Sequence, residues 1–146
     1  MKEKFAIPAV GAIIVKKVKN EEFILVQTRA KNSTDGTDGL LEIPAGKIRE
    51  YENIFEALRR EVWEETGAKV IHTNYLFSLP NTYLYSGFLV HTIDSFFRCQ
   101  LSSYDTIEAN DDASECQWIP LHKIDPEEFG LNSIRKGVRM VLQELL

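Results

Sequence analysis

Residues 44–68 read PAGKIREYENIFEALRREVWEETGA, and they contain the most clearly delimited helix of the chain. Asn53 is a favourable N-cap residue, and Glu56, three residues later, completes a capping box. Gly67 stands where a left-handed C-terminal cap is expected. We therefore predict a helix over residues 54–66.

Three carboxylates gather on one face of this helix. At about 100° per residue, Glu61 and Glu65 lie about 40° apart, and Glu64 lies about 60° from Glu61 on the other side. Like charges at this spacing repel each other, and the helix dipole disfavours negative charge near the C-terminal end. A divalent cation would reverse both penalties, and oxygen ligands suit Mg²⁺ or Mn²⁺ rather than zinc. The alternative interpretation is an acidic face exposed to solvent.

The overall composition is that of a folded globular protein. The chain has 146 residues and a mass of 16.7 kDa, which is the size of one domain. Its 44% hydrophobic and 27% charged residues argue against disorder, collagen and coiled coil. A net charge of −5 argues against a nucleic-acid binder that works through clustered Lys and Arg. We expect a single domain over residues 1–146 and no nucleic acid among its partners.

The acidic residues are concentrated in two segments. Residues 42–65 hold seven acidic and four basic residues, and residues 105–128 hold eight acidic residues and one lysine. The rest of the chain carries a net charge of +5. Because bound cations offset local acid, this distribution indicates where a metal, and through it an anionic substrate, would bind.

Cysteine usage and hydropathy predict a cytoplasmic protein without a membrane segment. Cys99 and Cys116 lack the Cys-x-x-Cys spacing of zinc and redox sites, so we expect two reduced thiols. The longest uncharged run, residues 70–93, contains too many polar side chains for about 20 residues of bilayer core. We interpret this run as two strands joined by a turn at Pro80–Asn81.

Short strands fill most of the remaining chain. The predicted strands are residues 9–18 and 22–28, which form a hairpin, 40–43, 70–79, a broken or bent strand over 88–101, and 115–120. Residues 31–39 have the composition of a loop, and apolar residues at helical spacing predict a C-terminal helix over 133–146. This order of elements predicts one α/β layered domain.

The residues on both sides of the three carboxylates form a longer pattern. It consists of Gly46, five residues, Glu52, seven residues, and then Arg60-Glu61-Val62-Trp63-Glu64-Glu65-Thr66-Gly67-Ala68. This pattern resembles the signature box of the Nudix hydrolases, with Ala68, small where a larger aliphatic residue is usual, as its one departure. A chance match of this length is on the order of one in a million. The resemblance implies a Nudix-like α/β/α sandwich with a mixed β-sheet, the Nudix helix and a C-terminal helix.

The resemblance also implies a role for each charged residue of the box. Glu61 and Glu65 would be the main Mg²⁺ (or Mn²⁺) ligands, Glu64 would assist them, and the backbone carbonyl at Ala45 would add a further ligand. Metal ions are needed because carboxylates alone would repel a diphosphate anion. The residues with implied catalytic or bracing roles are Glu52, Arg60, Glu64 and Asp112.

The roles implied outside the box rest on single positions. Asp112, in the acidic loop ahead of Trp118, is the candidate for a catalytic base or further metal ligand. Arg29 and Lys47 are the candidates for substrate binding, Lys47 through phosphate oxygens. The alternative for each residue is an ordinary exposed charge. Aromatic side chains that would either stack on a substrate ring or belong to the core are Tyr83, Tyr85 and Phe88.

The segment Pro44-Ala45-Gly46-Lys47 is similar to the version found in ADP-ribose and nucleotide-sugar hydrolases. We therefore hypothesise a Mg-dependent pyrophosphohydrolase that cleaves the diphosphate of a nucleoside diphosphate linked to another moiety, of the ADP-ribose, dinucleotide or nucleotide-sugar type. The alternatives are a nucleoside triphosphate pyrophosphatase of the pool-sanitising kind and a non-catalytic Nudix-fold nucleotide sensor. The expected partner is a small-molecule nucleotide diphosphate substrate. A homodimer is left open, although 146 residues leave no space for the N-terminal dimerisation segment of the sugar-nucleotide enzymes.

Overall fold

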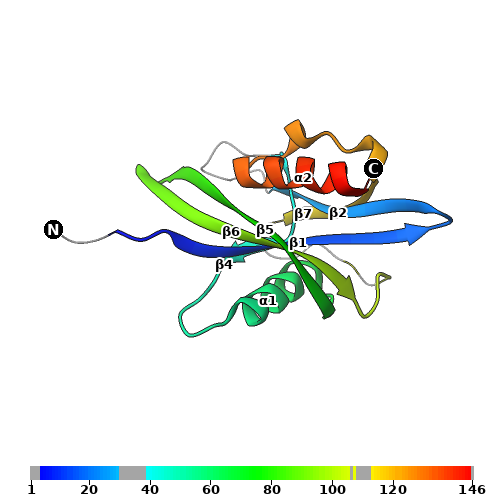
Figure 1. Ribbon diagram of the computed structural model, residues 1–146, viewed down its shortest axis with the longest axis horizontal. Coiled ribbons are helices and arrows are strands. Elements are labelled where there is room, and N and C mark those ends of the chain that lie inside the picture. Colours follow the sequence, from blue (N-terminus) through cyan, green and yellow to red (C-terminus); the bar gives the residue numbers. More distant parts are fainter. Residues whose placement is uncertain (1–3, 30–38, 106, 108–112, 146) are drawn as a thin grey trace.

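A computed structural model describes residues 4–29, 39–105, 107 and 113–145 of the chain. Strands predominate, and one α-helix lies in the middle of the chain and one at its end (Figure 1). The elements, in chain order, are β1 (Ile7–Val18), β2 (Glu21–Arg29), β3 (Leu41–Glu42), β4 (Ala45–Lys47), α1 (Ile54–Thr66), β5 (Val70–Tyr85), β6 (Phe88–Leu101), β7 (Ala113–Pro120), two short 3₁₀ turns, η1 (Leu121–Lys123) and η2 (Pro126–Glu128), and α2 (Asn132–Leu145).

The strands form one mixed sheet. Its main path runs β3-β2-β1-β6-β5, while β4 pairs with β1 and β7 pairs with β2. Strands β1 and β6 are parallel, and the other pairs are antiparallel. The predicted hairpin of β1 and β2 is present, and Lys19 and Asn20 turn it with positive φ angles of 50° and 66°.

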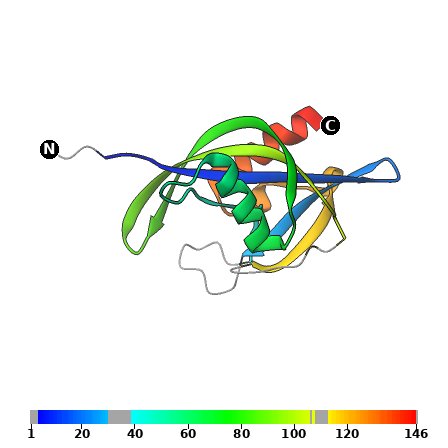
Figure 2. The same ribbon diagram turned by 90° about the horizontal axis from the view of Figure 1, so that it is seen from below.

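Helices α1 and α2 cover opposite faces of the sheet, as Figures 1 and 2 show. Along β1, Val10, Ala12 and Ile14 belong to the core cluster that contains α1, whereas Ile13 belongs to the cluster that contains α2. This division follows from the alternation of side chains along a strand. The expected α/β/α sandwich with a mixed sheet is therefore confirmed.

Helix α1 has the bounds that its local sequence predicts. The Asn53 side chain accepts a hydrogen bond from the Glu56 backbone N–H at 2.8 Å and donates one to the Glu56 carboxylate at 2.7 Å. Gly67 ends the helix with a φ of 74°, and its N–H donates to the Trp63 carbonyl at 2.9 Å. Both ends are thus set by contacts within one turn of the chain.

The predicted turn at Pro80–Asn81 is wrong. Strand β5 continues through these residues to Tyr85, and the chain turns at Ser86 and Gly87, with φ angles of 48° and 80°. Because β5 is the last strand of the sheet, a proline without an N–H is tolerated in it. Strand β6 is likewise unbroken, and the two register shifts of this hairpin lie in β5.

Helix α2 begins at Asn132, one residue before the predicted start. Within the described ranges, no helix has both the length and the apolar character that crossing a membrane requires.

Candidate functional site

Strand β4 lies so close to α1 that the Glu61 carboxylate fills the space above the glycine at the centre of the strand. A Cβ atom added to Gly46 would lie 2.1 to 2.6 Å from the carboxylate atoms of Glu61. Gly46 pairs with Val10 of β1, so the strand is held in place from its other edge. The Glu61 carboxylate therefore occupies the space above Gly46, directly beside the backbone of β4.

Arg60 joins three of the predicted carboxylates. Its Nε and Nη2 donate to the two oxygens of Glu52 at 2.7 and 2.9 Å, and its Nη1 donates to Glu61 at 2.7 Å and to Glu64 at 3.3 Å. Its Nη2 also donates to the backbone carbonyl of Lys47 at 3.0 Å. Because the Arg60 side chain is only 16% exposed, this fan of contacts holds the end of β4, the loop before α1 and the acidic face of α1 together.

This arrangement shifts the pKa values of Glu52 and Glu61 in opposite directions. Hydrogen bonds from the Arg60 guanidinium and, to a smaller extent, from the Arg49 backbone N–H lower the pKa of Glu52 to about 2. Burial raises the pKa of Glu61, and its contact with Arg60 offsets only part of that effect. Glu61 is thus a partly desolvated carboxylate, which a cation would stabilise.

Glu65 and Glu64 lie on either side of Glu61. The backbone N–H of Ala45 donates to Glu65 Oε2 at 3.1 Å, so the Ala45 residue and this carboxylate are neighbours. Glu64 is 33% exposed and also lies 3.6 Å from an Arg49 nitrogen. The side chains of all three acids line one polar cavity of about 580 Å³.

The donor set of this cavity fits a hard divalent cation, because it consists of carboxylate oxygens on one helix face next to a strand backbone. As the side chains lie, however, no three His, Cys, Asp or Glu residues within the described ranges are grouped closely enough to hold a metal ion. Oxygens of Glu61 and Glu65 instead accept hydrogen bonds from Arg60 and from the backbone of Ala45. Metal binding here would require rotation of these side chains.

Glu42 is a member of the site that the sequence reasoning missed. Arg29 Nη1 donates to Glu42 Oε2 at 3.1 Å, and the two side chains are 27% and 12% exposed. Strand β3 places Glu42 opposite Gln27 of β2, two residues before Arg29. The available signal was a lone acid inside the short apolar run that Pro44 ends.

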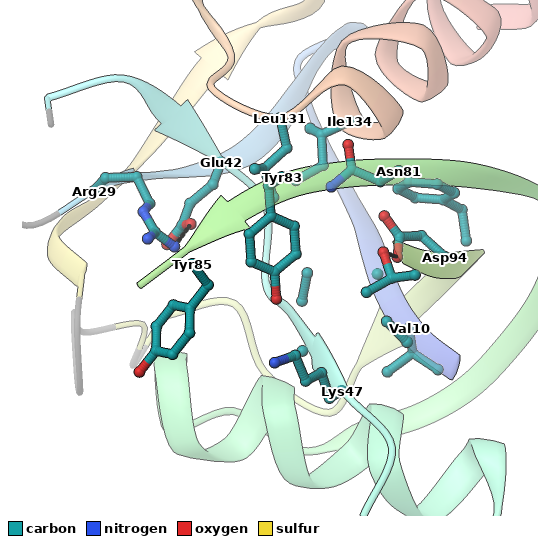
Figure 3. Close-up of a pocket in the computed structure, with 16 residues that line it drawn as sticks. Val10, Arg29, Glu42, Lys47, Asn81, Tyr83, Tyr85, Asp94, Leu131 and Ile134 are labelled. Atoms are coloured by element: carbon teal, nitrogen blue, oxygen red, sulfur yellow. Dashed lines mark hydrogen bonds and ion pairs between the residues drawn. The ribbon is translucent and has the colours of Figure 1, made fainter. Parts of the chain in front are cut away.

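A second cavity, of about 390 Å³, adjoins the first and shares Arg29, Glu42 and Ala45 with it. Lys47, the other predicted substrate contact, lines this cavity, with its Nζ 5.8 Å from the centre of the Tyr83 ring (Figure 3). Tyr85 lines it as well, so neither tyrosine belongs to the core.

Two candidates fall elsewhere. Phe88 is 73% exposed and is not among the residues that line either cavity. Asp112 lies outside the described residues. Both cysteines are free thiols, as expected, and burial raises the pKa of Cys99 to about 12.

The lowered pKa of Glu52 predicts how stability depends on pH. The contact of Glu52 with Arg60 stabilises the folded state fully above the unfolded pKa of about 4.5, and the stabilisation is lost as the pH falls towards 2. In Glu52→Gln we therefore expect a flatter fall of the melting temperature between pH 4.5 and 2.5. Thermal unfolding with EDTA present measures it, and the exposed Glu50→Gln is the matched control. An unchanged slope in Glu52→Gln would contradict the prediction.

Known proteins resemble this chain in both sequence and structure. A family model described as "NUDIX domain" matches residues 6–139. "Nudix hydrolase 6" and "Nudix hydrolase 7" of Arabidopsis thaliana are 32% and 31% identical to this chain over 116 and 115 residues. These alignments cover 78% and 77% of this chain but 39% of each relative, so the chain spans about two fifths of their length.

Solved structures show the same fold. The NUDIX domain of Shewanella oneidensis NrtR, in a structure with ADP ribose, superposes with a TM-score of 0.75 at 18% identity, over 99% of this chain and 91% of that one. A MutT protein from Methanosarcina mazei Go1 superposes with a TM-score of 0.72 at 23% identity, over 99% of both chains.

Proposed function

Because the chain belongs to the NUDIX domain family, we propose that it is a pyrophosphohydrolase, dependent on Mg²⁺ or Mn²⁺, that cleaves the diphosphate of a nucleoside diphosphate linked to another moiety. One observation carries this proposal. The polar cavity lined by Glu61, Glu64 and Glu65 adjoins a second cavity that is mainly apolar and aromatic. A phosphate-processing site next to an organic pocket is suited to a substrate that has both parts.

The residues of the polar cavity would divide the work as follows. Glu61 and Glu65 would hold the metal, with Glu64 and the Ala45 carbonyl assisting. A divalent ion held there would supply Lewis-acid polarisation of a phosphoryl oxygen and would lower the pKa of a water molecule. Arg60, through its hydrogen bonds to Glu52 and to the Lys47 carbonyl, braces the helix against the loop before α1 and β4.

Substrate contacts would come from two basic side chains, Arg29 at the border of the two cavities and Lys47 in the organic cavity. Arg29 is oriented by its hydrogen bond to Glu42, and its guanidinium is suited to two-pronged contact with phosphate oxygens. Lys47 follows Gly46 on β4 and lines the organic pocket, so its ammonium group would meet the phosphate nearer to that pocket. Asp112 stays the proposed general base or further metal ligand.

The substrate class rests on two supports. The Pro44-Ala45-Gly46-Lys47 segment resembles that of ADP-ribose and nucleotide-sugar hydrolases. The structurally similar NrtR domain binds ADP ribose, and we extend that ligand class to this chain.

A substrate panel tests the function. We expect purified protein with Mg²⁺ to convert ADP-ribose, dinucleotides or nucleotide sugars into two monophosphate products, with lower activity on nucleoside triphosphates. Product analysis by chromatography separates the alternatives, since a triphosphate pyrophosphatase would release pyrophosphate. Tight nucleotide binding without turnover of any compound would contradict catalysis and favour the nucleotide sensor.

Two expectations about the protein in the cell stay predictions. We propose a cytoplasmic location, which fractionation would test. The homodimer also stays a prediction. Light scattering on the purified protein would show whether its mass is that of one chain or of two.

A further inference from the structure

The organic cavity ends in a buried polar group on the α2 side of the sheet. Asn81 of β5 and Thr92 and Asp94 of β6 line this end, and their residues are 4%, 3% and 9% exposed. Ser133, in the first turn of α2, is fully buried beside them. The neighbouring wall is apolar and is formed by Phe96, Leu131 and Ile134. Such isolated polar groups in an apolar pocket usually select the ligand.

The hydrogen bonds of Asp94 leave it able to accept more. Thr92 Oγ1 donates to Asp94 Oδ1 at 2.7 Å, and Ser133 Oγ donates to Asp94 Oδ2. An ionised carboxylate has about four acceptor sites, so these two hydroxyls occupy about half of them. No cation contacts Asp94 among the described residues, and a ligand N–H group would supply the missing partner.

Asn81 supplies a donor next to this acceptor. Its Oδ1 accepts a hydrogen bond from the Ser133 backbone N–H at 3.4 Å, which fixes the amide and turns Nδ2 away from the helix. The β5–β6 register pairs Asn81 with Thr92 and Leu79 with Asp94, so Asn81 and Asp94 lie on one face of the sheet. Figure 3 shows both side chains at one end of the cavity.

The aromatic ring of Tyr83 lies between the polar end of the cavity and the end that contains Arg29. Arg29 and Glu42 lie at the opposite end of the cavity from Asn81 and Asp94, with Tyr83 between them (Figure 3). Tyr83 is two residues beyond Asn81 on the same strand, which places it about 7 Å further along the same face. A nucleotide matches this arrangement, because it has phosphate at one end and a base edge at the other.

We propose that Asp94 and Asn81 bind the base of the substrate and select a base edge that has an amino group beside a ring nitrogen. This inference rests on the proposed function. Adenine and cytosine have this edge: the amino group would donate to Asp94, and the ring nitrogen would accept from Asn81 Nδ2. In the same position, hypoxanthine and uracil place an oxo group opposite Asp94 and a ring N–H group opposite Asn81. An oxo oxygen facing the Asp94 carboxylate would leave two acceptors unpaired in a buried site.

Binding of product nucleotides tests the proposal without requiring turnover. Titrations of AMP against IMP and of CMP against UMP, with Mg²⁺ present, give the preference for the amino base. We expect the unmodified protein to bind AMP at least about tenfold more tightly than IMP, and CMP at least about tenfold more tightly than UMP. The reason is that IMP and UMP lose a hydrogen bond to a charged group. Equal affinities within both pairs would overturn the proposal, whether or not any variant folds.

The variant Asp94→Asn has the same shape and can keep its neighbours, because the Thr92 and Ser133 hydroxyls can both donate and accept. We expect it to reduce the preference for the amino base to near unity or to reverse it, since its amide can donate to an oxo group. The exposed Asp105→Asn makes the same chemical change outside the cavity and should leave the preference unchanged. Equal weakening of all four nucleotides in Asp94→Asn would show a merely structural role and overturn the proposal.

A second variant tests the donor. Asn81→Asp keeps an acceptor for the Ser133 N–H but removes the Nδ2 donor, so AMP should bind at least about tenfold more weakly. Unchanged AMP affinity in this variant would contradict the assignment. A preference for amino bases in a protein that hydrolyses no compound of the panel would overturn the proposed function alone, and turnover without base preference would overturn this inference alone.

Discussion

Glu61→Gln and Glu65→Gln should each reduce the metal-dependent kcat/KM by about 10³-fold or more, because Lewis-acid stabilisation supplies several kcal/mol and each 1.36 kcal/mol corresponds to a factor of ten. The amide keeps the shape of the side chain but removes the charge that a cation needs. Glu61 is only 13% exposed, so the charge that is removed belongs to a partly desolvated carboxylate.

Steady-state kinetics over a Mg²⁺ series, together with calorimetric titration of Mn²⁺, measure this effect. Both variants should bind the ion more weakly than the unmodified protein while melting in a single transition. Glu56→Gln is the matched control on the same helix, since its side-chain oxygen can still accept from Asn53. Activity close to that of the unmodified protein in Glu61→Gln or Glu65→Gln would refute the assignment of the metal site.

Gly46→Ala should lower kcat/KM by about 10²-fold, the size of effect that a displacement of about 1 Å in a catalytic group produces. The new Cβ would lie 2.1 to 2.6 Å from atoms of the Glu61 carboxylate, so that side chain must move. Gly46 is not among the described glycines with a positive φ, and alanine is therefore compatible with its backbone. The damage should fall on Glu61 rather than on the fold.

Kinetics and thermal unfolding of the same preparations separate these two effects. Gly137→Ala is the control for adding a Cβ away from Glu61, since the atoms nearest to that Cβ would be ring carbons of Phe77 and Phe96 at 3.3 to 3.5 Å. It should retain turnover. Loss of folding in Gly46→Ala, or full activity with a normal metal affinity, would contradict the role given to this contact.

Features decided by short-range contacts could be predicted from the sequence. Helix α1 begins and ends at the predicted residues because Asn53 and Gly67 act within one turn. The hairpin of β1 and β2 was predictable for the same reason, since its turn lies between two adjacent apolar strands. The continuation of β5 through Pro80 was not predictable, because it depends on β5 being the last strand of the sheet, which is a property of the whole fold.

The sequence by itself determined the family, the acidic face of α1 and the candidate ligands Glu61, Glu64 and Glu65, because these follow from spacing along one helix. Only the tertiary structure decided which distant residues share the site. Sheet pairing brings Glu42 to Arg29 and closes β4 onto Glu61, and the β5–β6 register places Asn81 beside Asp94. The physical reason is that cavities form between elements, and their lining depends on register and packing rather than on local spacing.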